Sequence, residues 1–126
     1  METKPFNATV SFTPNAAPNT AVVVLSGDIN AEAEVLLGSA YAEAEKHDSP
    51  IILLDFSRVN YMNSTGIALI VGLLARARRS KRRMIVAGLS EHYKEIFTIT
   101  RLSDFMSIFD SAETALANAA SMASQR

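Results

Sequence analysis

Three apolar runs of strand length, separated by segments with helical spacing, constrain the fold of this chain more than any other feature of its sequence. The runs are TAVVVLS (20–26), IILLDF (51–56) and MIVAG (84–88). Continuous apolar runs of this length are typical of strands covered on both faces. Because strands alternate with helices, we expect an α/β fold with a mixed sheet and helices packed on it.

The segment before the first run predicts an antiparallel hairpin. Residues 6–12 alternate apolar with polar side chains, which is the period of a strand with one buried face. TPNAAPN (13–19) carries two prolines and two asparagines, and so predicts a loop. The sheet should therefore open with an edge strand that pairs antiparallel with the first apolar run.

Two helices are predicted between the three apolar runs. The first covers residues 31–46, with Asn30 as its cap, and the second begins within YMNSTGIALIVG (61–72). The positions expected to face the core are Ala33, Leu37, Ala40, Tyr41 and Ala44 in the first helix, and Ile67, Ile70, Val71 and Leu74 in the second.

Three short elements are predicted after the third run. SEHYKEIFT (90–98) should form a helix capped by Ser90, and FMSIF (105–109) a last strand. In DSAETALANAASMAS (110–124), Asp110 and Glu113 have the spacing of a capping box before an alanine-rich helix.

Composition excludes several classes of function. With 126 residues, of which 48% are hydrophobic, we expect a single domain over 1–126, ordered over about 5–120. The formal net charge of −1 gives the whole molecule no reason to bind nucleic acid. Without cysteine there is no disulfide and no thiolate, and the two histidines lack metal-ligand spacing, so we expect no metal and no cofactor. No apolar run reaches membrane-spanning length, which predicts a cytoplasmic protein without membrane insertion.

Two adjacent hydroxyls, Ser64 and Thr65, stand where the second helix begins. In one interpretation Asn63, Ser64 or Thr65 caps the helix by accepting a hydrogen bond from a free amide. A nucleophile elbow is disfavoured because that motif needs glycine two residues before the serine, where this chain has Met62. A third interpretation makes Ser64 an acceptor of phosphate.

A phosphate on Ser64 would leave the fold intact and still disrupt binding. At a helix N-terminus the phosphate meets free amides and the positive end of the helix dipole. A partner surface packed over Ser64 would instead have to desolvate about two negative charges. A penalty of about 3 kcal/mol weakens binding roughly a hundredfold, so one hydroxyl is sufficient for a switch.

Two other groups of charged residues have simpler interpretations. RARRSKRR (76–83) carries six basic side chains, which could bind phosphates or an acidic partner but are typical of the solvated last turn of a helix. Asp28 and Asp55 follow predicted strands, and with no third ligand implied we interpret both as turn residues.

Three segments together resemble the STAS domain, and specifically the bacterial anti-sigma-factor antagonists. They are LSGDIN (25–30), IILLDFSRVNYMNSTGIALIVGLL (51–74) and IFTITRLSDFMSIFDSAETAL (96–116). The resemblance spans roughly residues 5–120 with the elements in the same order. It implies partner switching, in which the antagonist binds a serine-kinase anti-sigma factor, is released when that kinase phosphorylates it, and is restored by a PP2C-type phosphatase.

Matched to the family motif, the phosphorylated hydroxyl is Ser64, followed by Thr65 and Gly66, so that one hydroxyl receives phosphate while its neighbour serves the start of the helix. Asn63 and Asn30 stand where many members have aspartate, which removes negative charge near the phosphate.

The sequence thus predicts a regulatory binding protein, not an enzyme. Its partner-binding residues are Asp28, Asn30, Asn63, Ser64, Thr65 and Gly66. The resemblance leaves open a cytoplasmic STAS subunit of an ABC lipid or anion transport system, and a scaffold in a larger assembly. It is also compatible with a homodimer.

Overall fold

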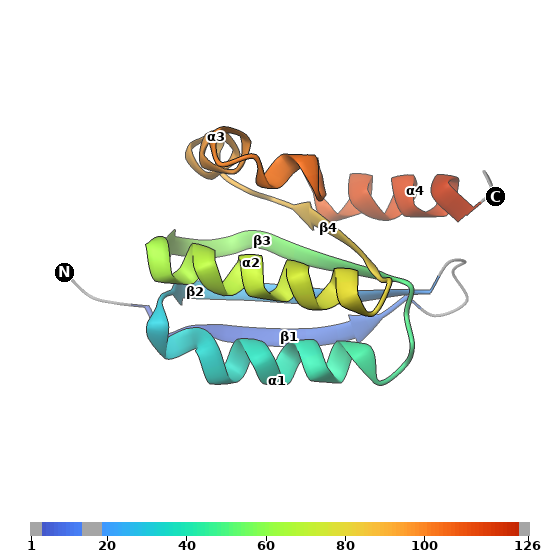
Figure 1. Ribbon diagram of the computed structural model, residues 1–126, viewed down its shortest axis with the longest axis horizontal. Helices are drawn as coiled ribbons and strands as arrows, with labels where there is room; N and C mark the ends of the chain where they lie inside the picture. Colours follow the sequence, from blue (N-terminus) through green and yellow to red (C-terminus); the bar gives the residue numbers. More distant parts are fainter. Residues whose placement is uncertain (1–3, 14–18, 124–126) are drawn as a thin grey trace.

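The computed structural model describes residues 4–13 and 19–123 of the chain (Figure 1). Along the chain the elements are β1 (Asn7–Phe12), β2 (Thr20–Ile29), the 3-10 turn η1 (Ala31–Ala33), α1 (Glu34–Glu45), β3 (Ile51–Met62), α2 (Ser64–Arg79), β4 (Arg83–Ala87), α3 (Glu91–Ile99), the 3-10 turn η2 (Leu102–Asp104), β5 (Ser107–Phe109) and α4 (Ala112–Ala123). The predicted proline-rich loop falls largely on residues 14–18, outside the described residues.

The five strands form one mixed sheet in the order β1-β2-β3-β4-β5. β1 is an edge strand that pairs antiparallel with β2, and the other neighbours pair in parallel. The sheet order follows the chain order, because a helical segment connects each strand to its parallel neighbour. This confirms the predicted mixed α/β fold and its opening hairpin.

Alternate residues of the central strands face two separate layers of apolar packing. α1, α2 and α3 pack against one face of the sheet, and α4 packs against the other. In Figure 1, α1 and α2 lie side by side along β1, β2 and β3, while α4 lies apart from them. The first face is formed by Ala21, Val23, Leu25, Ile52, Leu54, Phe56, Met84 and Val86, and the second by Ile51, Leu53, Ile85 and Ala87. This alternation explains why the strands read as continuous apolar runs.

The predicted core positions of the first helix are confirmed, because all five side chains are buried. In α2 the prediction was wrong for Val71, which is 40% exposed. The buried stripe of α2 is formed by Gly66, Ile70, Leu73, Leu74 and Ala77. Val71 follows Ile70 by about 100° around the helix and so points away from the sheet.

Several predicted details differ from the structure. The last strand covers Ser107–Phe109 and not 105–109, because Phe105 ends the 3-10 turn η2. β3 continues to Met62 instead of ending at Phe56, because β2 runs beside it as far as Ile29 and pairs its backbone groups. Asp110 does not cap α4; the Ser111 hydroxyl accepts from the Thr114 amide instead, at 3.1 Å.

Asp110 instead accepts a hydrogen bond from the Lys94 ammonium, at 2.6 Å. This hydrogen bond holds the pKa of the Asp110 carboxyl below its ordinary value. The side chain therefore joins α3 to the β5–α4 turn and is not available to the first turn of α4.

Candidate functional site

The carboxyl ends of β2 and β3 lie next to each other and bring two distant parts of the sequence together. Ile29, the last residue of β2, is paired with Met62, the last residue of β3. The chain then continues into Asn30 on one side and Asn63 on the other. The Asn63 amide donates to the Ile29 carbonyl at 3.2 Å, which ties the start of α2 to the end of β2.

Each of the two asparagines caps the helical segment that follows it. Asn63 Oδ1 accepts from the Gly66 amide at 2.8 Å, and Asn30 Oδ1 accepts from the Glu32 amide at 2.9 Å. The predicted cap at Asn30 is therefore confirmed. Of the three candidate caps for α2, the structure selects Asn63, so the prediction that Thr65 serves the helix start was wrong. An amide side chain in extended backbone geometry reaches the third residue of a helix well.

Ser64 is the first residue of α2 and its side chain is exposed. Its hydroxyl makes no hydrogen bond to any residue in the described part of the chain. The first intrahelical bond of α2 runs from the Ile67 amide to the Asn63 carbonyl, so the Ser64 and Thr65 amides precede the regular ladder. An anion attached to the Ser64 oxygen would meet these amides at the positive end of the helix dipole.

Gly66 allows α2 to start this close to the sheet. A Cβ atom at this position would lie 2.0 Å from the Ile29 carbonyl oxygen. Because that oxygen is backbone at the end of a paired strand, it cannot move aside cheaply. Gly66 is therefore a structural requirement of the site.

Asp28, the residue before Ile29 in β2, is buried and only 6% exposed. Its Oδ2 accepts from the Lys4 amide at 3.0 Å, and its Oδ1 accepts from the Asn60 side chain at 2.8 Å. The interpretation of Asp28 and Asp55 as turn residues was wrong, because both lie within strands. Asp28 joins the N-terminal segment, β2 and β3, since its two oxygens reach both sides of the strand.

Tyr93 and Asn60 support the site and were missed by the sequence analysis. The Tyr93 hydroxyl accepts from the Met62 amide at 2.8 Å and donates to the Met62 carbonyl at 3.2 Å. It therefore holds the last residue of β3 from α3. The two residues lie 31 positions apart, and no local pattern in the sequence indicates this pairing.

The exposed face of α2 beyond Ser64 has no charged side chain for about three turns. It consists of Thr65, Ala68, Val71, Gly72 and Ala75. Tyr61, at the end of β3, is 52% exposed. On the side of Asn30, a hollow of about 300 Å³ is lined by Lys4, Asp28, Asn30, Glu32 and the half-exposed Leu36. Ser64 therefore begins an uncharged surface of small and apolar side chains.

Across residues 4–13 and 19–123, the structure contains no group of three or more His, Cys, Asp or Glu side chains suited to a metal ion. In the same part of the chain no helix has the length and apolar character needed to span a bilayer.

Comparison with known proteins identifies what this arrangement is similar to. Residues 11–115 match the sequence profile of the STAS domain. The anti-sigma-B factor antagonist of Listeria monocytogenes is 28% identical over 86 residues, which cover 68% of this chain and 75% of that protein.

Solved structures share the fold at lower identity. An anti-sigma factor antagonist from Mycobacterium paratuberculosis superposes with a TM-score of 0.76 at 16% identity, covering 91% of this chain and 94% of the other. Phosphorylated SpoIIAA from Bacillus gives a TM-score of 0.64 at 20% identity, covering 87% and 98%. The profile match covers most of the chain, and the sheet, its order and its helices agree with these structures: the chain belongs to the STAS domain family.

Proposed function

We propose that this protein is an anti-sigma factor antagonist whose affinity for its partner is switched by phosphorylation of Ser64. The observation that carries the proposal is the position of Ser64, exposed at the first residue of α2 with a hydroxyl that has no hydrogen-bond partner among the described residues. The names of the related proteins that match over most of this chain support the role of anti-sigma factor antagonist.

The unmodified surface suits a protein partner. The uncharged face of α2 and the exposed Tyr61 ring offer small and apolar contacts without the cost of desolvating charge. Ser64 lies at one end of that face. A phosphoryl group transferred from ATP to Ser64 Oγ, with ADP leaving, would place about two negative charges there.

The same phosphate leaves the fold undisturbed. It extends from an exposed oxygen beside the first amides of α2, where negative charge is favourable by about 0.3 to 1 kcal/mol. Asn63 and Asn30 are neutral caps, so neither repels the phosphate with a full charge. Phosphorylation would therefore change binding and not folding.

The proposed partner-binding residues have two kinds of role. Asn30, Ser64 and Thr65 lie at the surface where a partner can contact them. Asp28, Asn63 and Gly66 position them, through the bonds to Lys4 and Asn60, the helix cap and the close approach to Ile29.

We propose a serine-kinase anti-sigma factor as the partner that binds the unmodified protein and phosphorylates it. A PP2C-type phosphatase would remove the phosphate and restore binding. Both assignments rest on the family resemblance together with the exposure of Ser64. A subunit of a transport system has less support, because the named sequence relatives are antagonists of anti-sigma factors.

Binding measurements on Ser64 variants test the proposal. Candidate kinases are first incubated with the protein and ATP, and mass spectrometry maps the modified residue. Titration calorimetry with the active kinase should then give an affinity about a hundredfold lower for Ser64→Asp than for the wild type. Ser64→Ala should bind and resist phosphorylation.

Two controls separate this effect from added charge and from misfolding. Asn118→Asp places the same charge on the exposed face of α4, on the opposite side of the sheet, and should bind like the wild type. Thermal unfolding of Ser64→Asp should match that of the wild type. Equal kinase affinity for Ser64→Asp and the wild type would refute the proposal.

A further inference from the structure

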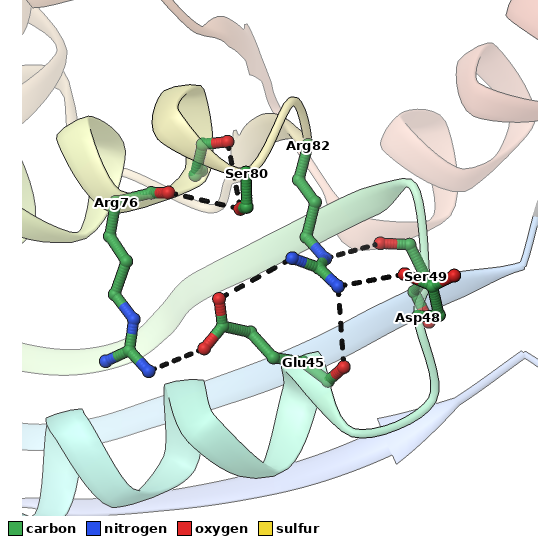
Figure 2. A network of polar contacts seen from close by, with 7 residues as sticks. Glu45, Asp48, Ser49, Arg76, Ser80 and Arg82 are labelled. Atoms are coloured by element: carbon green, nitrogen blue, oxygen red, sulfur yellow. Dashed lines mark hydrogen bonds and ion pairs between the residues drawn. The ribbon is translucent and has the colours of Figure 1, made fainter.

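The basic run 76–83 divides into inward and outward side chains. Arg76 and Arg82 turn toward the end of α1, as Figure 2 shows. The Arg82 guanidinium donates to the Ser49 carbonyl at 3.2 Å and the Asp48 carboxylate at 3.0 Å, and lies 3.6 Å from Glu45 Oε2. Its side chain is only 13% exposed. Two of the six cations thus serve the fold.

The other four cations have no such partner. Arg78, Arg79, Lys81 and Arg83 are exposed, and none forms an ion pair with a carboxylate of the described residues. The negative end of the α2 dipole accounts for favourable cations in its last turn only. Lys81 and Arg83 lie beyond that turn, so a concentration of uncompensated positive charge remains.

A groove of about 560 Å³ lies beside these cations. Arg78, Lys81 and Arg83 contribute to its lining, together with Asp104 and Phe105. β5 pairs with β4 only from Ile85 onward. Arg83 and Met84, at the start of β4, therefore extend beyond Ser107, the first residue of β5, and the groove lies in this space. Met84 and Met106 supply apolar lining.

An exposed aromatic ring adds to this lining. Phe105 is 54% exposed, and the Arg78 guanidinium lies 5.0 Å from the centre of its ring. A large apolar side chain at the surface beside three cations that have no carboxylate partner among the described residues indicates a ligand with both apolar groups and negative charge.

We propose that this groove binds an acidic segment of a partner protein that also carries an apolar anchor residue. Carboxylates of the segment would face Arg78, Lys81 and Arg83, and the anchor would pack on the exposed Phe105 ring. Charge complementarity and the exposed ring together favour a protein segment over a nucleic acid. A duplex presents one phosphate charge about every 1.7 Å, but its bases are stacked inside, so it offers no apolar group to the exposed Phe105 ring.

The groove is distant from the phosphorylation site. Ser64 is the first of the 16 residues of α2 and Arg78 lies in its last turn, so about 20 Å of helix separates them. Figure 1 shows the two ends of α2 at opposite ends of the sheet. This exceeds the Debye length of about 8 Å at physiological salt. Binding in the groove should therefore be independent of the charge on Ser64. A partner bound there should stay bound when Ser64 is phosphorylated or dephosphorylated.

Fluorescence anisotropy with a labelled peptide tests the proposal directly. The probe is a short peptide that alternates glutamate or aspartate with leucine and phenylalanine. The wild type should bind it with an affinity that falls as salt rises, and Arg78→Glu/Arg83→Glu should bind it at least about tenfold more weakly. Ser64→Asp should bind it like the wild type, which makes this test independent of the proposed kinase.

Three controls make the result specific. Arg58→Glu reverses an exposed charge on β3 and should leave peptide binding unchanged. Phe105→Ala should weaken binding of the peptide and not change its salt dependence. Circular dichroism confirms that each variant is folded.

The proposal is overturned if the double variant binds like the wild type, or if Arg58→Glu weakens binding as much as the double variant does. Tighter binding of a short RNA or DNA duplex than of the peptide, lost in the same double variant, would also overturn it and assign the groove to nucleic acid.

Discussion

Ser64 is exposed because the residues on either side of it carry the structural tasks of the helix start. Asn63 provides the cap, and its own amide is bound to the Ile29 carbonyl. Gly66 provides the close approach between α2 and β2. With these tasks assigned elsewhere, the serine hydroxyl is left without a structural partner among the described residues. A modification at that oxygen can therefore act on binding alone.

Replacement of Gly66 by alanine should destabilise the protein by about 2 kcal/mol or more, because overpacking against rigid backbone forces the elements apart. The added Cβ would lie 2.0 Å from the Ile29 carbonyl oxygen. Urea denaturation measures the free energy of unfolding.

Gly72→Ala is the matched control, since nothing lies within 4 Å of its Cβ position on the same helix. It should stabilise the protein by about 0.5 to 1 kcal/mol through helix propensity. If both variants shift the free energy of unfolding in the same direction, the close approach at Gly66 is not what determines its identity.

At the scale of elements, the sequence predicted those parts of the fold that have a local pattern. The buried face of α1 and the hairpin follow the periods of 3.6 and 2 residues, and both are confirmed. The second half of β3 was missed because SRVNYM (57–62) has no clear apolar alternation. That half of the strand depends on pairing with β2 and on the bond between Asn60 and Asp28, which are interactions across the sequence.

The candidate site, like the fold, was predictable only where it depends on a local pattern in the sequence. Asn63 and Ser64 lie beyond Phe56, the predicted end of their strand, so their meeting with Asn30 depends on the missed second half of β3. The place of Asn30 near the carboxyl end of a predicted strand could be expected. Which residue caps α2 could not, since Asn63, Ser64 and Thr65 are all good capping residues. Tyr93 could not be predicted either, because its hydroxyl reaches the backbone of another element.

Tyr93→Phe tests how much α3 contributes to the end of β3. The change removes both hydrogen bonds to Met62 and leaves partly buried backbone groups unpaired, which should cost about 1 to 3 kcal/mol of unfolding free energy. Amide exchange should accelerate at Met62 more than in the central part of β3. Glu95→Gln, an exposed change on the same helix, is the control and should have little effect. Unchanged exchange at Met62 would mean that the pairing with β2 alone holds the strand end.

At the scale of the whole molecule, the two ends of the sheet have different polar chemistry. The end with Ser64 has neutral caps and an exposed hydroxyl. The other end has an ion-pair network in which Arg76 and Arg82 converge on Glu45 and join α1, α2 and the loop before β4 (Figure 2). The Arg76 guanidinium also lies 4.9 Å from the centre of the Tyr41 ring. The network stabilises the end of the sheet opposite Ser64.

Arg82→Met should therefore lower the free energy of unfolding without changing phosphorylation of Ser64. The variant keeps an apolar stem but leaves the Ser49 carbonyl without its buried donor and Glu45 with Arg76 as its remaining cation, which should cost about 1 to 3 kcal/mol. Arg79→Met removes an exposed, unpaired cation from the same run and should stay within about 0.5 kcal/mol of the wild type.

A double-mutant cycle with Glu45→Gln isolates the contribution of the ion pair. Additive losses in that cycle would show that Arg82 acts through its other contacts, the Ser49 carbonyl and the Asp48 carboxylate, and not through the Glu45 carboxylate. Equal stability of the Arg82 and Arg79 variants would show that the network does not hold this end of the fold.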